Sequence, residues 1–413
     1  MTKALKFSLP LVCLLIVSLC QANELSINGN FKTFLLLQGP PKISGRSQIS
    51  SAWLFSGPLR LSLSYVPEEY LSLNFAYNLT PKVETPVTAG LLSSSSSILR
   101  RYRLNDFSRT VYPGAGAAPG HFAVFQNLDR AYVRMSLGPS DMYIGRQAIA
   151  SGSARMINPT DVVAPYPFEE LDSEERIGVD ALKIGLAFGP LAEVSSGYIL
   201  GRNSNIDSSA VFIRGKLNCM KSDVSLTAMQ FRGNDLLGFD VARTIGGAGF
   251  WFEGAYVRFR EEGTAAAGIH HYSFRFSTGM DYRFSEKIYA FGEYHFSADG
   301  ESDAGHYPGN SAKSAFTEGT TYLMARHYFF PDMLYQITPL CTSNTEPLIN
   351  LNDGSVLLTQ AFEYNLTQNS YVKAGAFWGL GKRDKWINPM TILSRSEFGN
   401  YPDFYYISFR FYF

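Results

Sequence analysis

The segment that ends the chain alternates strictly between large apolar and polar positions. Counting back from Phe413, Phe411 and Ile407 fall on one face, and Arg410 and Ser408 fall on the other. Side chains of a strand point to opposite faces with a period of two, so this pattern predicts a strand. Two environments fit such a strand: the inner face of a soluble sandwich, or a barrel wall between lipid and a wet interior.

The same alternation recurs far from the C-terminus. It is clearest in the segments Pro58–Val66, Tyr70–Leu79 and His271–Phe284. Strand follows strand, and after residue 22 no apolar run reaches the roughly 20 residues that a membrane helix needs. A membrane role for this chain therefore requires a barrel.

The first 22 residues have the layout of a secretory signal peptide. Lys3 and Lys6 precede a short apolar core, and Cys20-Gln21-Ala22 is an acceptable cleavage site. Residues 1–22 are thus predicted to be removed, and residues 23–413 to form one domain. Lipidation at Cys20 is the alternative. Of the later cysteines, Cys219 and Cys341, both a single pairing and two separate thiols stay open.

The connections between the expected strands alternate in length. The short links are Val66–Glu69, Gly138–Ser140, Gly189-Pro190, Asn218–Ser222, Gly246–Ala248, Ser285-Glu286, Pro331-Asp332 and Leu366–Ser370. The longer ones are Gln38–Ser47, Thr80–Gln126, Ser151–Gly178, Arg202–Ser208, Arg260–Gly268, Ala298–Gly319, Thr342–Gly354 and Gly381–Tyr401. Only Gly233–Asp235 is short where a long connection is due. Short periplasmic turns and long extracellular loops are typical of an outer-membrane barrel.

These observations predict an all-β fold, a transmembrane antiparallel up-and-down β-barrel of about 18 strands, within a range of 16–18. The second strand must be long and bulged at Gly57-Pro58 to keep that number. The last strand must pair with the first, around Leu25–Leu37, because a closed sheet leaves no unpaired backbone groups in lipid.

One stretch resembles a known family. Leu128–Phe168 reads as a strand, a Gly-Pro turn, Gly145-Arg146-Gln147, and then Asn158-Pro159-Thr160-Asp161. This layout is similar to porin-like barrels of Gram-negative bacteria, the broad group that includes alginate-export-type channels. Many of those relatives carry a tryptophan before the loop glycine, where this chain has Ser151-Gly152. The terminal phenylalanine likewise resembles the signal that the barrel assembly machinery of the outer membrane reads.

Enzyme, metal and nucleic-acid functions find little support. The formal charge is zero, and −2 once Lys3 and Lys6 are removed, which argues against a nucleic-acid partner. The six histidines form no metal-binding motif, and no cofactor motif is present. Glu293 and His295 share a strand face, so half of a catalytic dyad and a plain polar pair are both conceivable. We expect no enzyme, no catalytic residue, no metal and no cofactor.

The face that alternation assigns to the lumen is rich in basic residues. They are Arg60, Arg134, Lys183, Arg275, Arg283, Lys373 and Arg410, and Arg146 joins them by the resemblance only, because its strand position groups it with Ile144. Asp281 is the clear acidic member. Either this wall favours anions, or loop carboxylates fold in and neutralise it. Those carboxylates are Asp161, Glu169, Glu170, Asp172, Glu174 and Glu175.

The sequence therefore predicts a porin-like channel of the bacterial outer membrane. Its solutes would be small, polar and anionic, or it would export an anionic polymer. Thr80–Gln126 and Ser151–Gly178 are the loops expected to narrow the lumen. Expected partners are outer-membrane lipid, the solutes and the assembly machinery. The alternative is a barrel enzyme or a surface-binding barrel that does not conduct.

Overall fold

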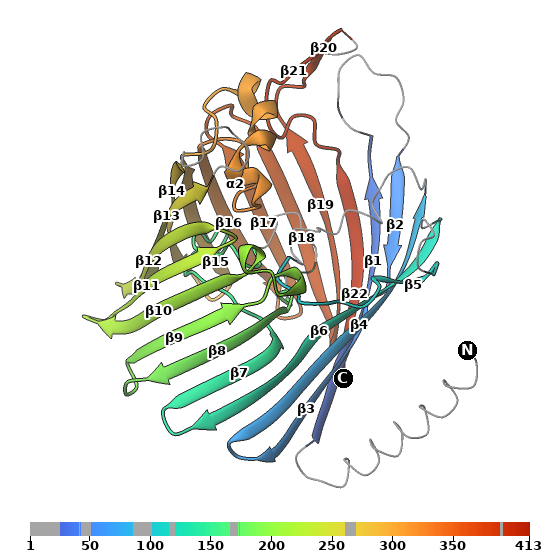
Figure 1. Cartoon of the computed structure of the whole chain (residues 1–413). Helices are drawn as coiled ribbons and strands as arrows, with labels where there is room; N and C mark the ends of the chain where they lie inside the picture. The colour runs from blue at the N-terminus through green and yellow to red at the C-terminus, as the bar shows by residue number, and fades with distance from the viewer. Residues whose placement is uncertain are drawn as a thin grey trace.

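The computed structural model of this 413-residue chain is dominated by one sheet that closes on itself (Figure 1). It describes residues 25–40, 42, 51–85, 101–114, 120–165, 172, 174–260, 270–388 and 391–413. The signal peptide expected at residues 1–22 lies outside these described residues. So do Glu169 and Glu170 of the expected constriction loop.

The strands of the main sheet follow one another around the barrel. They are β1 (Leu25–Gln38), β2 (Ala52–Ser56), β3 (Leu59–Glu68), β4 (Leu71–Thr85), β5 (Thr110–Tyr112), β6 (Phe122–Leu137), β7 (Ser140–Gln147), β8 (Val179–Ala187), β9 (Ala192–Ile199), β10 (Ala210–Cys219), β11 (Ser222–Phe231), β12 (Asn234–Ile245), β13 (Ala248–Arg260), β14 (His270–Arg283), β15 (Ile288–Ser297), β16 (His327–Thr338), β17 (Cys341–Asn350), β18 (Val356–Thr367), β19 (Ser370–Leu380) and β22 (Phe404–Tyr412). Every ladder between neighbours is antiparallel.

Eighteen strands make up the closed wall, as the sequence predicted. β2 and β3 are two halves of one long strand, since both pair with β1 on one side and β4 on the other. They meet at Gly57-Pro58, the position of the expected bulge. The peptide groups there stay bonded, because Lys32 N donates to Pro58 O at 2.9 Å and Gly57 N to Pro81 O at 2.9 Å. β5 only adds to β6 and lies outside the ring.

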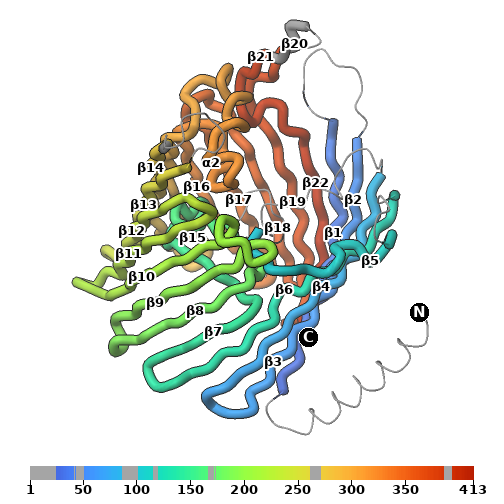
Figure 2. Tube along the Cα trace, in the orientation of Figure 1, coloured from blue at the N-terminus to red at the C-terminus, as the bar shows by residue number. Residues whose placement is uncertain are grey.

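The C-terminal strand closes the barrel, which confirms the predicted pairing of last with first. β22 pairs with β1 from Phe404 opposite Gln38 to Tyr412 opposite Asn30. Beyond the strand, Phe413 and Gly29 exchange two backbone hydrogen bonds of 2.8 and 3.0 Å. The two strands run side by side in Figure 2. The chain can therefore place all wall backbone groups in ladders without a free edge.

Short turns and long connections collect at opposite ends of the barrel (Figure 1). The loop end carries η3 (Arg202–Ser204), η4 (Ile206–Ser208), η5 (Ala304–Ala312), α2 (Ser314–Thr317) and the hairpin of β20 (Lys385–Asn388) and β21 (Thr391–Leu393). The tight turn between β11 and β12 at Arg232-Gly233 is the short exception that the sequence predicted. Both of its residues have positive φ, 47° and 77°.

One predicted turn is wrong. Pro331-Asp332 lies inside β16, and the turn falls at Pro339-Leu340 instead. The predicted loop Thr342–Gly354 is largely β17, followed by a tight turn. Between the described pairs Phe329–Ile349 and Met333–Thr345 the ladder is interrupted, where Pro331 lies opposite Pro347. Neither proline has an N–H group to donate to the ladder, and the strand continues on both sides of the interruption.

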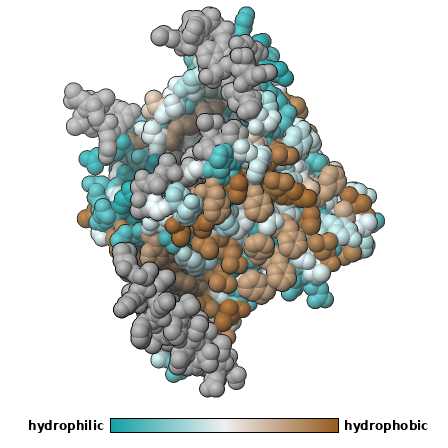
Figure 3. Space-filling view, turned by 90° about the vertical axis from the view of Figure 1, so that its right-hand side faces the viewer, coloured by the Kyte–Doolittle hydropathy of each residue, from teal (hydrophilic) through white to brown (hydrophobic). Residues whose placement is uncertain are grey.

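Alternation separates the two faces of the wall. Outward Leu61 and Phe75 are exposed at 44% and 42%, whereas inward Arg60 and Ala76 are buried. Hydrophobic side chains gather over the middle of the face in Figure 3, with hydrophilic ones towards its margins. An apolar band around a barrel with polar rims is the surface that a membrane-spanning barrel presents to lipid.

Candidate functional site

The connection between β7 and β8, residues 148–178, enters the barrel and is called the β7–β8 loop. Gly152 makes the entry possible, since it has φ +100° and a Cβ there would lie 2.4 Å from Glu253 Oε2. Only glycine both adopts this positive φ readily and leaves room for the Glu253 carboxylate. This residue belongs to the Ser151-Gly152 pair that departs from the tryptophan-glycine of the resembling barrels.

Glu253 of β13 accepts hydrogen bonds from both ends of one turn in the β7–β8 loop. Its Oε2 accepts hydrogen bonds from Ser153 N at 2.8 Å and Ala154 N at 2.9 Å. Its Oε1 accepts from Thr160 N at 2.8 Å and Thr160 Oγ1 at 2.7 Å. The carboxylate is completely buried, so the loop backbone has replaced its water.

Glu293 of β15 accepts hydrogen bonds from the tip of the same turn. Arg155 N donates to Oε2 at 2.8 Å, and Ile157 N donates to Oε1 at 3.0 Å. Met156 N lies 3.2 Å from Oε1, and the indole N–H of Trp251 donates to Oε2 at 2.8 Å. Carboxylate side chains on the inward face of the wall thus bind backbone N–H groups of the loop.

β14 supplies the matching donors. Arg275 Nε donates to the carbonyl of Pro159 at 2.8 Å, and Ser277 Oγ donates to the carbonyl of Ile157 at 2.7 Å. Arg275 also donates to the carbonyl of Thr320 in the β15–β16 connection. The buried guanidinium therefore ties two loops to one wall strand.

The returning part of the loop binds another part of the wall. Lys32 of β1 pairs with Asp172 and Glu174, at 2.7 Å each. Arg410 of β22 also pairs with Glu174, and Arg60 lies 3.4 Å from Glu175. Burial acts against ionisation of Glu174, yet hydrogen bonds from Lys32, Tyr412 and Tyr371 lower its pKa to about 2.

These two attachment areas lie on different sides of the ring. β16 to β19 separate β13–β15 from β22–β1–β3 in one direction, and β4 to β12 separate them in the other. A loop that starts at β7 and reaches both areas must cross the lumen. The prediction that 151–178 narrows the lumen is thus supported by its contacts with both walls.

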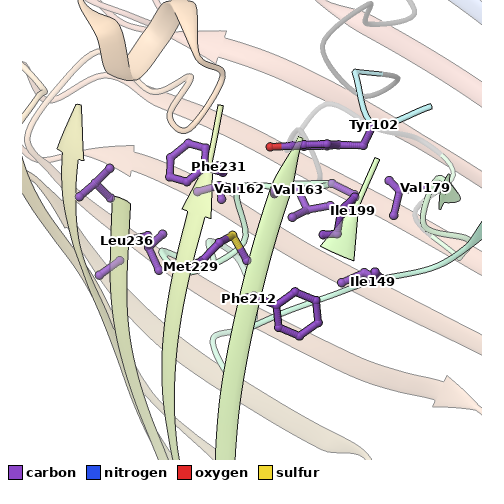
Figure 4. Close-up of a cluster of buried hydrophobic side chains, with 14 of the residues drawn as sticks. Tyr102, Ile149, Val162, Val163, Val179, Ile199, Phe212, Met229, Phe231 and Leu236 are labelled. Atoms are coloured by element: carbon purple, nitrogen blue, oxygen red, sulfur yellow. The ribbon is translucent and has the colours of Figure 1, made fainter. Parts of the chain in front are cut away.

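One side of the lumen is filled by apolar packing. Val162, Val163 and Ala164 of the loop pack with inward Phe212 and Leu236 and their neighbours on β10–β13. Figure 4 shows the loop side chains and the wall side chains converging in this cluster. Tyr102, from the other expected constriction loop, joins it and accepts a hydrogen bond from Arg232 at 2.9 Å. Burial raises the pKa of Tyr102.

The opposite side has an apolar cluster around Phe330 and Leu348 toward the loop end and a polar, part-exposed wall nearer the turn end. Its inward side chains on β16–β19 include Asp332, Gln336, Asn344, Glu346, Thr359, Glu363 and Lys373. A recess of about 30 Å³ lies here between Met156 of the loop and the β15–β18 wall. Arg155 points from the loop toward β13–β15, where it pairs with Asp281 and lies 4.8 Å from the Trp251 ring centre.

The predicted basic set does share the inward face, but most members have partners. Arg60 pairs with Asp129 at 2.8 Å, and Arg134 with Asp141 at 3.0 Å near the turn end. Lys183 lies over the Tyr143 ring, and Lys373 lies opposite Glu363. Arg283 is exposed beside the β14–β15 turn and donates to the carbonyl of Glu286.

Arg146 lies inside, as the resemblance implied and simple alternation did not. Its exposed fraction is 6%, against 44% for Ile144 two residues before it. Gly145, at φ +119°, breaks the alternation between them. The guanidinium binds Asp180 at 2.7 Å and Asp106 at 2.9 Å.

Several residues of this region were not singled out as site residues from the sequence: Lys32, Glu253, Asp332 and Glu346. Glu293 was singled out only as part of a possible dyad. Alternation alone would have placed Lys32 and Glu253 inward, because each directly follows an outward phenylalanine, Phe31 or Phe252. Their loop partners are distant in the sequence, so alternation carried no signal for the contacts.

The suspected half dyad has other partners. Glu293 accepts from the loop, whereas His295 Nδ1 lies 2.9 Å from Ser277 Oγ. Within the part of the chain that the structure describes, no group of three or more His, Cys, Asp or Glu could hold a metal ion. Cys219 and Cys341 are both free thiols.

No family model matches the sequence, and no curated protein matches it. Solved porins share the architecture. A BenF-like porin from Pseudomonas fluorescens Pf-5 is 9% identical with a TM-score of 0.57, over 94% of this chain and 98% of that one. Pseudomonas aeruginosa OccK9 (OpdG) is 10% identical with a TM-score of 0.56, over 94% and 98%.

OccK2 (OpdF) of the same organism, solved in complex with glucuronate, is 11% identical with a TM-score of 0.55, over 94% and 97%. At such identities the likeness establishes the fold. The chain thus has the large antiparallel barrel fold of these outer-membrane porins, which confirms the porin-like resemblance at the level of the fold.

Proposed function

We propose that this outer-membrane barrel is a passive channel for small polar solutes. The observation that carries the proposal is the division of the lumen by the β7–β8 loop. The β9–β13 side is packed with apolar side chains. The β16–β19 side has an apolar cluster around Phe330 and Leu348 toward the loop end, but it keeps part-exposed charged and polar groups nearer the turn end. A solute that crosses the barrel would follow the polar side.

A preference for anions stays a prediction, and we expect it to be weak. Lys32, Arg60 and Arg410 have carboxylate partners from the β7–β8 loop or the wall. Asp332 and Glu346 add negative charge to the polar side. Paired charges attract counter-ions far less than a row of free cations would.

Glucuronate, which the solved OccK2 (OpdF) structure contains, is a suitable anionic probe. Export of an anionic polymer is less favoured, because a loop fixed to both sides of the lumen leaves little room for a chain. An enzymatic role has less support, since the two residues of the suspected dyad bind other groups. Assembly through the C-terminal strand remains part of the proposal.

Liposome swelling tests the proposal. Folded protein in liposomes should admit glucose and glucuronate at rates within about twofold of each other, as paired wall charges imply. Boiled protein provides the control. Folded barrels that admit neither solute would favour the alternative of a non-conducting, surface-binding barrel.

A further inference from the structure

We propose that Glu253 and Glu293 form a two-carboxylate clamp that holds the β7–β8 loop in the lumen and thereby sets the size limit for solutes. The clamp is defined by these two residues alone. The claim about solute size rests on the proposed channel function. The claim about loop position does not.

The first argument is the number of main-chain donors that converge on the clamp. N–H groups of Ser153, Ala154, Arg155, Ile157 and Thr160 all donate to these two side chains at 2.8–3.0 Å. A buried N–H without a partner costs free energy comparable to a lost hydrogen bond. The loop turn therefore has a strong reason to stay where the carboxylates are.

The second argument is that the site requires carboxylates. A carboxylate only accepts hydrogen bonds, and bonds to a charged acceptor are the stronger kind. Glutamine at either position would direct an NH₂ group at backbone donors. Among the described residues, neither carboxylate has an ion-pair partner within 4.0 Å. The loop N–H groups are thus the main compensation for two buried negative charges.

The third argument is the fit of the loop around Glu253. Gly152 brings the backbone so close that an added Cβ would lie 2.4 Å and 2.5 Å from the two carboxylate oxygens. The positive φ of Gly152 sets the direction of the turn as well. Sequence and geometry are matched to this one side chain, which an incidental contact would not require.

Release of the clamp would change the polar side of the lumen. Met156, at the tip of the turn, forms one wall of the recess beside β15–β18. Arg155 next to it pairs with Asp281. If the tip leaves Glu293, Met156 moves away from the β15–β18 wall and the path for solutes widens.

The test uses the full-length protein, with Cys219 and Cys341 replaced by serine because both are free thiols. Val163→Cys places a reporter thiol on the loop, at a position that is 4% exposed. Glu253→Gln and Glu293→Gln remove the clamp one carboxylate at a time. Glu363→Gln is the matched control, since Glu363 is an inward wall carboxylate that lies opposite Lys373 and has no described bond to the loop.

Each clamp variant should increase the rate at which maleimide labels the reporter thiol by about tenfold or more, and Glu363→Gln should leave that rate unchanged. An unchanged rate in both clamp variants overturns the proposal. An equal increase in Glu363→Gln also overturns it, because the loop would then respond to any loss of inward charge. Only protein that still shifts its gel position on boiling is scored.

Gly152→Ala keeps the proposal testable if the glutamine variants fail to fold. It alters only the loop and should also increase labelling, and no increase would contradict the clamp. Polymer exclusion in planar bilayers then tests the size limit, with larger polyethylene glycols entering the clamp variants. A parent protein that never conducts refutes the channel function, whereas a conducting parent with an unchanged cut-off refutes only the clamp's control of size.

Discussion

Ser273 and Ser277 face into the barrel, as alternation predicts, but neither meets water. Both are almost completely buried. Ser277 binds the loop at Ile157 O and His295, and Ser273 binds Asp299. Arginine is therefore not expected to be tolerated at either position. Alternation along a strand predicts which face of the wall a residue lies on. Whether an inward side chain is exposed to solvent depends on the loops that enter the barrel.

Arginine substitutions test the faces at the residue scale. Phe274→Arg places a charge in the lipid-facing band at a cost of about 2–4 kcal/mol. Ser277→Arg should lose folded barrel as well, because it displaces the loop. Asn28→Arg, at an inward and exposed position near the turn end, should be tolerated. The measurement is the heat-modifiable fraction, and equal losses for Asn28→Arg and Phe274→Arg would refute the assigned faces.

Glu397, in the β19–β22 connection, predicts a pH dependence. Burial raises its pKa to about 7, although Tyr328, Met324 and Asn350 donate hydrogen bonds to it. Its ordinary value is 4.5, so the folded state holds a proton that the unfolded state releases. The resulting stabilisation is complete below about pH 4.5 and is lost as pH rises through about 7.

The thermal midpoint of the parent in detergent should therefore fall relative to that of Glu397→Gln between pH 5 and pH 8. The glutamine variant cannot titrate at this position, so it serves as the reference at each pH. A difference between the two proteins that stays constant over this range would show that Glu397 does not carry the effect.

At the element scale, β22 depends on its full length. Removing Phe411–Phe413 deletes the rungs opposite Phe31 and Asn30 and both bonds to Gly29. The truncated chain should give less than about a tenth of the parent's folded barrel, because unpaired strand edges are not tolerated in lipid. Phe413→Ala keeps the backbone and is the control. Normal yields of folded truncated protein would show that closure does not need these rungs.

The strands themselves followed from the sequence. Alternation placed Arg60, Arg275 and Arg410 inward, and the spacing of turns predicted 18 strands. The error at Pro331 arose because a proline often ends a strand, whereas here the β16–β17 ladder is interrupted only between Phe329–Ile349 and Met333–Thr345 and then resumes in the same register. Strand pairing is set by neighbouring segments, which a sequence pattern can reveal.

The contacts between the loop and the wall could not be predicted from the sequence. Ser153 and Glu253 are 100 residues apart, and Lys32 and Asp172 are 140 apart. Alternation along a strand carries no information about contacts between residues so far apart. The sequence therefore left open whether loop carboxylates pair with the basic residues of the wall. The structure shows Asp172, Glu174 and Glu175 in those contacts. Long-range pairing of this kind depends on how loops pack after the barrel closes.

On the scale of the whole molecule, a closed barrel should be heat-modifiable. Its ladders form one continuous ring, so detergent at room temperature should not unfold it. Unboiled protein should migrate differently on a gel from boiled protein. Identical migration of the two samples would argue against a closed barrel in solution.

The account rests centrally on a water-filled path along β16–β19, and single-channel recording in planar bilayers tests it most directly. Purified folded protein should produce discrete current steps, with a reversal potential in a salt gradient that stays near zero because the lumen charges are paired. Folded, heat-modifiable protein that inserts into the bilayer without any current step would contradict the account.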